Sequence, residues 1–419
     1  MFYWIALFPQ FHSMAILRYG ADRSVQLEFA EGVFPVECHA PRGEPVADVA
    51  AAVTEALAAP LGYPPLARST TPGDRIVLAL DRDIAQVAQI TASVIGAFVK
   101  AGVDPDGISV LRPPANSQTP LDDPCRLLEE PLRERIGVYT HEPDNRDVLA
   151  YLTAADSGEP ILVHRAIHDA DLVLPIGCLH DDAAAGYYGI HTPVFPAFSD
   201  QKTQRRFRPL GSLDVGGDTK ARLTAEVDQV AWLLGINFTI QLVPAAGDGV
   251  LHVLAGESEA VRRRGRQLYG EAWSCQAPQQ ASLVVAAIEG DASQQTWENF
   301  GRALQSAAAL VEDGGSIAVC CRLTGELGPA MQQMAGARSR DAALHRIGKE
   351  RPLDALPAAQ LARALDRAKV YLLSGLDPSL VEEMDMIHVA ADEELIRLVR
   401  HHPSCILLSN AARAMIVPP

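Results

Sequence analysis

The chain has 419 residues, of which 48% are hydrophobic and 21% charged, and its formal net charge at pH 7 is −16. This length exceeds what one ordinary core accommodates and fits two domains. The composition excludes an intrinsically disordered chain. The negative charge repels polyanions, so the sequence predicts no nucleic-acid partner, and the basic run at 262–266 is interpreted as a solvated helix face.

Seven cysteines without a CxxC pair or regular spacing indicate reduced thiols and a cytoplasmic location rather than a disulfide framework. Residues 1–13 are apolar but carry no basic region and no small-residue cleavage site, and they are too short to span a bilayer. We therefore expect no membrane association. Because Met14 opens the first strand pattern, residues 1–13 are interpreted as an over-extended N-terminus.

The predicted elements alternate between strands and helices. Strands are predicted at 24–29 and 34–38, and an Ala-rich helix at 46–59 ends at Pro60. An apolar run at 75–81, a helical stretch at 84–101 and a second run at 107–111 form a β-α-β unit, which requires a parallel sheet. Later strands are predicted at 171–177, 281–288, 316–321, 369–374 and 404–409, and helices at 297–311, ending at Gly314-Gly315, and at 328–334.

This pattern predicts an α/β fold with a mixed or parallel N-terminal domain at 14–268 and a smaller α/β domain at 269–419. Ligands of parallel sheets bind at the carboxyl ends of the strands. We therefore expect the segments at 81–83 and 112–119 to lie beside a binding pocket. His164 and His168 are four residues apart and are interpreted as part of a polar helix surface.

Several stretches resemble the nickel-dependent lactate racemase family in order and spacing, and together they cover nearly the whole chain from Met14. They are Pro60-Leu-Gly-Tyr-Pro-Pro-Leu66, Asp169-Ala-Asp171 leading into Ile176-Gly177, Ala185-Gly-Tyr-Tyr-Gly189, Ala255-Gly256 after a strand, and the helix from Trp297 with Gly325-Glu-Leu-Gly328 beyond it. The resemblance implies an N-terminal domain that holds cofactor and substrate, and a smaller C-terminal domain that closes over a cleft.

The resemblance also implies 2-hydroxy-acid racemase or epimerase chemistry on a nickel pincer nucleotide, which needs a tethering lysine, a histidine on the metal and two acid/base histidines. No lysine lies between Lys100 and Lys202, and Thr192 falls near the tether position. Asn116 is the nearest match to the first catalytic histidine, and the nickel-ligand position falls in the polar run 201–208. The missing lysine and histidine argue against a tethered nickel pincer nucleotide.

At other positions the resemblance implies acid/base and substrate-binding residues that this sequence keeps or replaces with similar ones. His180 matches the second acid/base histidine, Asp81 matches an acidic residue near the substrate with Arg82 as a stand-in for an arginine, and Arg302 replaces a lysine of the C-terminal domain. The loop that faces the cofactor in the family contains Gly186, Tyr187, Gly189 and Thr192 here.

Three interpretations stay open at this point. The chain is a diverged racemase or epimerase relative that acts through His180, or it is a non-catalytic protein that binds a small hydroxy acid or sugar acid. A third interpretation makes the segment 180–182, with His191 as a weak candidate, a site for a divalent metal ion. Its spacing matches no established metal motif, and the sequence predicts no oligomeric state.

Overall fold

The computed structural model describes residues 13–82, 84–114, 122–155, 157–214 and 216–417. The chain forms two compact α/β units. Unit 1 comprises Met1–Ala40, Cys275–Thr324 and Gln360–Pro419, and unit 2 comprises Pro41–Ser274 and Gly325–Ala359. This division differs from the predicted boundary at 268/269. The segment 14–40, which was predicted in the N-terminal domain, belongs to unit 1, and the segment 325–359, which was predicted in the C-terminal domain, belongs to unit 2.

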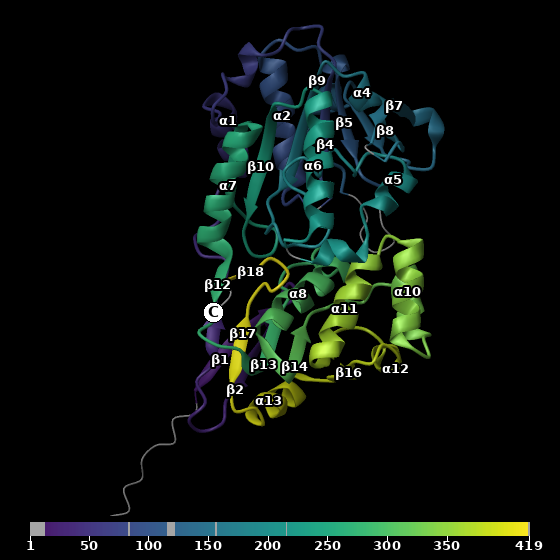
Figure 1. The fold of residues 1–419 in the computed structure, drawn as a ribbon. Coiled ribbons are helices and arrows are strands. Elements are labelled where there is room, and N and C mark those ends of the chain that lie inside the picture. The colour runs from purple at the N-terminus through teal and green to yellow at the C-terminus, as the bar shows by residue number, and fades with distance from the viewer. Residues whose placement is uncertain (1–12, 83, 115–121, 156, 215, 418–419) are drawn as a thin grey trace, which may run out of the picture. The chain divides into compact units, whose positions relative to one another are not determined.

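Unit 2 is built around a six-stranded sheet with the order β11-β10-β9-β4-β5-β6, whose central strands lie side by side in Figure 1. The strands are parallel except β11, which runs antiparallel to β10. Both faces of the sheet are covered, which explains the continuous apolar run of β4. The strands are β4 (Ile76–Leu80), β5 (Ile108–Arg112), β6 (Gly137–Thr140), β9 (Leu172–Cys178), β10 (Phe238–Pro244) and β11 (Val250–Glu257).

Two apolar cores cover the faces of this sheet. On one face, α1 (Val49–Ala58) and α2 (Val87–Lys100) pack against β4 and β10. On the other face, α4 (Arg165–His168), α6 (Asp218–Leu233) and the loop that follows β9 pack against β4 and β9. The other elements of unit 2 are α3 (Glu130–Arg133), the hairpin of β7 (Leu149–Ala154) and β8 (Pro160–His164), α5 (Gln201–Arg206), α7 (Ser258–Trp273), α9 (Pro329–Ala335) and α10 (Arg340–Glu350). Short 3₁₀ turns lie at Leu66–Arg68, Pro105–Gly107, Arg146–Val148 and Leu210–Leu213.

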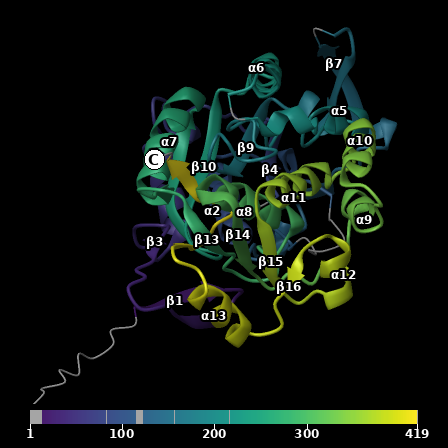
Figure 2. The same ribbon diagram turned by 60° about the horizontal axis from the view of Figure 1, so that its bottom comes forward.

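Unit 1 has its own six-stranded parallel sheet, with the order β16-β15-β14-β13-β17-β3. Figure 2 shows β13, β14 and β15 together with α8. The elements are β3 (Val36–Cys38), β13 (Ala281–Ala287), α8 (Trp297–Leu310), β14 (Val311–Cys320), β15 (Lys369–Leu373), α12 (Pro378–Glu383), β16 (Ile387–His388), α13 (Asp392–Arg400) and β17 (Cys405–Leu408). Helix α11 (Ala355–Arg367) contains a unit boundary, and β12 (Ser274–Gln276) pairs with β18 (Met415–Val417).

The N-terminal strands complete unit 1 rather than unit 2. β1 (Met14–Tyr19) and β2 (Arg23–Glu28) form an antiparallel hairpin that buries alternate residues. These buried residues join the core of the unit 1 sheet and α13. β3 pairs with β17, with Cys38 opposite Leu408. Local periodicity predicts such strands but not which sheet they join.

The sequence had predicted that a helix ends at Gly314-Gly315, and this prediction was wrong. Helix α8 ends at Leu310, and β14 begins at the next residue. The pairing of β14 with β13 shifts register in this region, and Gly314 has φ +78°. The two glycines therefore belong to a bulge within the strand.

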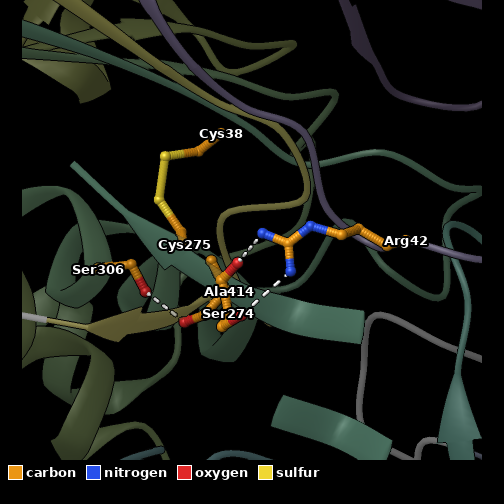
Figure 3. The surroundings of a disulfide bond; sticks show 6 residues. All are labelled: Cys38, Arg42, Ser274, Cys275, Ser306 and Ala414. Atoms are coloured by element: carbon orange, nitrogen blue, oxygen red, sulfur yellow. Dashed lines mark hydrogen bonds between the residues drawn. A yellow bond between two sulfur atoms is a disulfide. The ribbon is translucent and has the colours of Figure 1, made fainter. Parts of the chain in front are cut away.

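The expectation of seven reduced cysteines is wrong, because Cys38 and Cys275 form a disulfide bond (Figure 3). The two residues lie next to the positions 40/41 and 274/275 at which the chain passes between units. Arg42 donates to the backbone oxygen of Ser274, at 2.7 Å, and to its hydroxyl, at 3.1 Å. The described free cysteines are all buried. Among the described residues, no helix has the length and apolarity that a membrane crossing requires.

Candidate functional site

The carboxyl edge of the unit 2 sheet brings together Asp81 and His180. Asp81 directly follows β4, and its backbone N–H donates to Ile176 O at 2.9 Å. His180 follows β9 by two residues, and the intervening Leu179 N–H donates to Leu242 O at 2.9 Å. Backbone pairing thus continues past the strand ends and holds both side chains at the edge where such sheets bind ligands.

Gly177, near the end of β9, allows three groups to approach one point. A Cβ on this residue would lie 2.7 Å from Pro193 Cγ, 3.3 Å from Gln241 Oε1 and 3.4 Å from Asp81 Oδ2. The first distance is too short for a real Cβ contact, so only glycine fits here without a shift of its neighbours. Gly177 therefore carries part of the site geometry.

His180 and Tyr187 form the aromatic centre of the site. Their ring centroids are 5.3 Å apart, and both side chains are buried. Burial raises the pKa of Tyr187 well above its usual range, and the negative charges of Asp182 and Asp81 add to the increase. The tyrosine hydroxyl is therefore protonated at neutral pH and available as a hydrogen-bond donor.

Arg266 is a cation whose charge acts on Tyr187 and that sequence reasoning did not select. It lies in α7, where Arg263, Arg264 and Arg266 are exposed, as predicted for the basic run. Its Nη2 atom is 2.7 Å from Asp182 Oδ2. The positive charge of Arg266 opposes the effect of the carboxylates on the pKa of Tyr187.

The loop at 186–192 is held by its own hydrogen bonds. Gly186 and Gly189 have φ of +77° and +98°, which glycine adopts without strain. The Thr192 hydroxyl donates to Gly189 O at 2.7 Å and accepts from Tyr188 N at 3.0 Å. Thr192 thus closes the loop as a turn residue.

The residues present do not fit a tethered nickel pincer nucleotide. Thr192 offers a hydroxyl engaged within its loop where a tether needs an amine. In the region of the expected metal ligand, the Gln204 side chain donates to Ala197 O and Ser199 O, both at 3.1 Å. We therefore derive no chemical step from this cofactor.

The structure does not support the divalent metal interpretation either. The described residues contain no group of three or more His, Cys, Asp or Glu side chains with the geometry of a metal site. His191 is buried, and its pKa is lowered to about 4 by burial and by the charge of Arg262. A neutral imidazole binds metals, but one ligand does not make a site.

Three further predicted site residues are Arg82, Asn116 and Arg302. Arg82 is exposed beside Asp81, and Asn116 lies outside the described residues. Arg302 belongs to α8 of unit 1, where Nη1 donates to Asn299 Oδ1 at 3.4 Å. Its role toward a ligand stays a prediction.

Gln241 is a site residue that the sequence reasoning missed. It is fully buried in β10, between apolar neighbours in the sequence FTIQLVP. A single amide in an otherwise apolar buried strand is a signal that a sequence reading can use, because a buried polar group requires specific partners.

A pair of buried histidines was also missed. His141, after β6, lies with its Nε2 atom 2.8 Å from Ser199 O, and its ring centroid is 5.5 Å from that of His164. His164 was expected on a polar helix surface, but it is buried and caps α4 by accepting from Ala166 N at 3.2 Å. The prediction was wrong because helix α4 begins only after His164.

Fold and site together define a two-unit α/β protein with an acidic and aromatic cluster at the carboxyl edge of a parallel sheet. Residues 19–207 match the family model of the lactate racemase N-terminal domain. This segment of the chain is therefore similar to the N-terminal domain of lactate racemase, in agreement with the resemblance seen in the sequence.

Solved structures agree with this assignment at the level of the fold. The lactate racemase apoprotein from Thermoanaerobacterium thermosaccharolyticum superposes with a TM-score of 0.77 at 15% identity, covering 96% of this chain and 100% of that one. A protein from Thermotoga maritima gives a TM-score of 0.65 at 13% identity, covering 90% of this chain and 99% of that one. No curated protein sequence matches the chain.

Proposed function

We propose that unit 2 binds a small 2-hydroxy acid or sugar acid at the carboxyl edge of its sheet, without a tethered nickel pincer nucleotide. The observation that carries the proposal is the contact of His180 with Tyr187, whose hydroxyl lies in the field of Asp81, Asp182 and Arg266. Parallel α/β sheets bind small ligands at this edge.

Each group has a use toward such a ligand. The Tyr187 hydroxyl donates a hydrogen bond to a carboxylate or carbonyl oxygen. The imidazole of His180 donates or accepts a proton of the ligand hydroxyl. Arg266 contributes positive charge, which its ion pair with Asp182 offsets in part.

A second candidate is a diverged racemase or epimerase, and the match to the lactate racemase N-terminal domain favours it. Inversion at the α-carbon through hydride transfer needs an acceptor for the hydride. His180 alone transfers only a proton, and losing one general base from a pair costs about 10²- to 10⁴-fold in rate. The binding role is therefore the conclusion that the residues support best.

Ligand-induced stabilisation and nickel content separate the two candidates. The full chain is purified after co-expression with the machinery that makes the pincer nucleotide. Thermal unfolding is then followed with a panel of hydroxy acids and sugar acids, and nickel is measured by elemental analysis. We expect at least one ligand to stabilise the protein by about 2.7 kcal/mol at 100 times its Kd, with nickel at background and no isomerisation.

Thr192→Lys is the matched variant for the nickel measurement, because it restores an amine at the tether position. We expect nickel to remain at background, since the expected ligand position also lacks histidine. Near-stoichiometric nickel and isomerisation of a hydroxy acid by the wild-type chain would establish the second candidate. A panel without any stabilising ligand would refute the binding role.

A further inference from the structure

We infer that His141 and His164 form an acid-sensitive contact between the β7–β8 hairpin and the segment 195–200, and that this contact separates in mild acid before the rest of unit 2 unfolds. Both histidines are buried, although the histidine side chain takes up a proton readily near neutral pH. The inference does not depend on the proposed function, because it concerns residues outside the cluster of His180 and Tyr187.

The end of the hairpin and the segment 195–200 are joined along the backbone. Val163 and Ser199 form an isolated antiparallel bridge, and His164 N donates to Phe198 O at 2.8 Å. Apolar side chains from both parts also share one core. The rings of the two histidines lie beside this contact, and their centroids are 5.5 Å apart.

The hydrogen bond of His164 requires a neutral imidazole. Its Nδ1 atom accepts from Ala166 N at 3.2 Å and thereby caps helix α4. A ring nitrogen that accepts carries no hydrogen, so the hydrogen of the neutral ring is on Nε2. A proton on Nδ1 would place two N–H groups against each other and remove the cap.

His141 is restricted in a similar way. Its Nε2 atom lies 2.8 Å from Ser199 O, and this nitrogen carries the hydrogen because a carbonyl oxygen only accepts. The Nδ1 atom is buried, and among the described residues it has no hydrogen-bond partner. A proton on Nδ1 would create a buried charged group without an acceptor. Hydrogen bonding therefore favours the neutral form of both rings in the folded chain.

Charged residues adjoin the pair from the turn after β6, from α4 and from α5. Burial lowers the pKa of His141, and the carboxylates of Asp200, the N-cap of α5, and Glu142 offset only part of this effect. Burial, and secondarily the neighbouring His141, lower the pKa of His164 to about 4. Arg165 of α4 directs its guanidinium to a backbone oxygen of β7. The carboxylates are thus too weak to compensate for the burial of a charged ring.

Separation of the hairpin from the segment allows both rings to take up protons. Histidine in an unfolded chain titrates near pH 6.5, so the separated form gains on the closed form as the pH falls from there toward 4. For His164 alone, the ratio of the separated to the closed form rises about 20-fold between pH 7 and pH 5. Strands β4 and β5 contain no histidine. The contact should therefore open before the central sheet does.

Backbone hydrogen bonds connect the segment to the loop at 186–192. Val194 N and Phe195 N both donate to His191 O, at 2.9 Å and 3.1 Å. The end of the loop is thus anchored on the part of the chain that the histidine pair holds in place. A fall in pH should therefore loosen this loop as well as the segment.

Hydrogen exchange of the full chain tests the inference. Exchange is followed by mass spectrometry at pH 7 and pH 5, with correction for the intrinsic exchange rates at each pH. We expect peptides that cover 160–168 and 195–200 to exchange at least about 20-fold faster at pH 5, whereas peptides of β4 and β5 keep their protection. This difference distinguishes a local opening from global unfolding, which affects all peptides together.

Variants that keep the hydrogen bonds but do not titrate identify the residues responsible. In His164→Asn, the side-chain oxygen accepts from Ala166 N as Nδ1 does, and in His141→Gln, the amide nitrogen donates to Ser199 O as Nε2 does. The double variant should reduce the acceleration at pH 5 to less than about threefold. His191→Gln is the matched control, because His191 is also buried and has a pKa lowered to about 4 but lies outside the contact. It should keep the full response.

The wild-type measurement decides the inference even if a variant does not fold. Equal protection of 160–168 and 195–200 at the two pH values overturns it. Faster exchange of all peptides together at pH 5 also overturns it, because acid then unfolds unit 2 as a whole. A response that persists in the double variant but disappears in His191→Gln assigns the effect to the loop and removes the histidine pair as its cause. The opposite pattern in these variants supports the inference.

Discussion

The backbone of Leu61 lies directly against the α-carbon of Gly256. Leu61 N donates to Ala255 O, and Glu257 N donates to Leu61 O, both at 2.8 Å. A Cβ on Gly256 would lie 2.5 Å from Leu61 N and closer still to Leu61 O. Two of the motifs that resemble the lactate racemase family, Pro60–Leu66 and Ala255-Gly256, are thus the two sides of one backbone contact.

Replacing Gly256 by alanine is expected to lower the free energy of unfolding by about 2–4 kcal/mol, because the new methyl group meets backbone atoms and Gly256 has φ +146°. Chemical denaturation measures this change. Gly73→Ala is the matched control, since its Cβ would meet no atom within 4 Å. Equal stability of the two variants would show that the contact tolerates a side chain.

Tyr187 and Tyr188 are neighbours with different partners, which allows a paired test. Tyr188 donates from its hydroxyl to Phe207 O, so Tyr188→Phe should cost about 1 kcal/mol of stability and leave ligand affinity unchanged. Tyr187→Phe removes the protonated hydroxyl of the site and should weaken binding of a stabilising hydroxy acid by about tenfold. Calorimetric titration together with thermal unfolding measures both quantities. The assignment fails if the two variants bind alike.

The disulfide between Cys38 and Cys275 closes a segment with a sequence separation of 237. Such a crosslink restricts the unfolded chain, so reduction should lower the free energy of unfolding by about 2–5 kcal/mol. Denaturation with and without dithiothreitol measures the effect. The double variant Cys38→Ser, Cys275→Ser is the control and should not respond to the reductant. A wild-type chain that is equally insensitive would mean that the bond contributes nothing to stability.

Stability should also decrease in mild acid because of the buried histidines. Burial, and secondarily the neighbouring His141, lower the pKa of His164 to about 4, and burial also lowers the pKa of His141. Unfolded histidine titrates near pH 6.5, so below this pH the unfolded chain binds more protons than the folded one. The contribution is present above about pH 6.5 and is lost as the pH falls toward 4, at a cost of up to about 3 kcal/mol for His164.

Denaturation midpoints between pH 7 and pH 4.5 test this expectation. His164→Gln should flatten the pH dependence, because glutamine does not titrate. His168→Gln, at an exposed position beside Asp169, should leave the slope as in the wild-type chain. A slope that is the same in wild type and His164→Gln would remove His164 as the cause.

Local patterns predicted most strands and helices close to their observed bounds. The run ending at Asp81 is β4, and the helix expected at 297–311 is α8. Such predictions succeed because burial on both faces of a parallel sheet leaves a continuous apolar run in the sequence. The bulge at Gly314-Gly315 escaped prediction because glycine signals both a helix end and an irregular strand.

The candidate site was predictable only in part. His180, Tyr187 and Asp81 were selected from their places in motifs, and the structure brings these three together. Gln241 and Arg266 come from a distant strand and helix, and no local pattern predicts that Gln241 packs beside Gly177 or that Arg266 pairs with Asp182. The place of Gln241 follows from strand order and from the missing side chain of Gly177.

The sequence by itself determined the α/β class, the resemblance to the lactate racemase family and the absence of a lysine and a histidine where the chemistry of that family needs them, because these are properties of residue order and type. Tertiary structure alone decided that β1–β3 join unit 1, that Cys38 forms a disulfide bond with Cys275 and that the Gln241 amide oxygen packs beside Gly177. These outcomes depend on pairing between residues far apart in the chain. The burial and hydrogen bonding that select such pairs exist only in the folded protein.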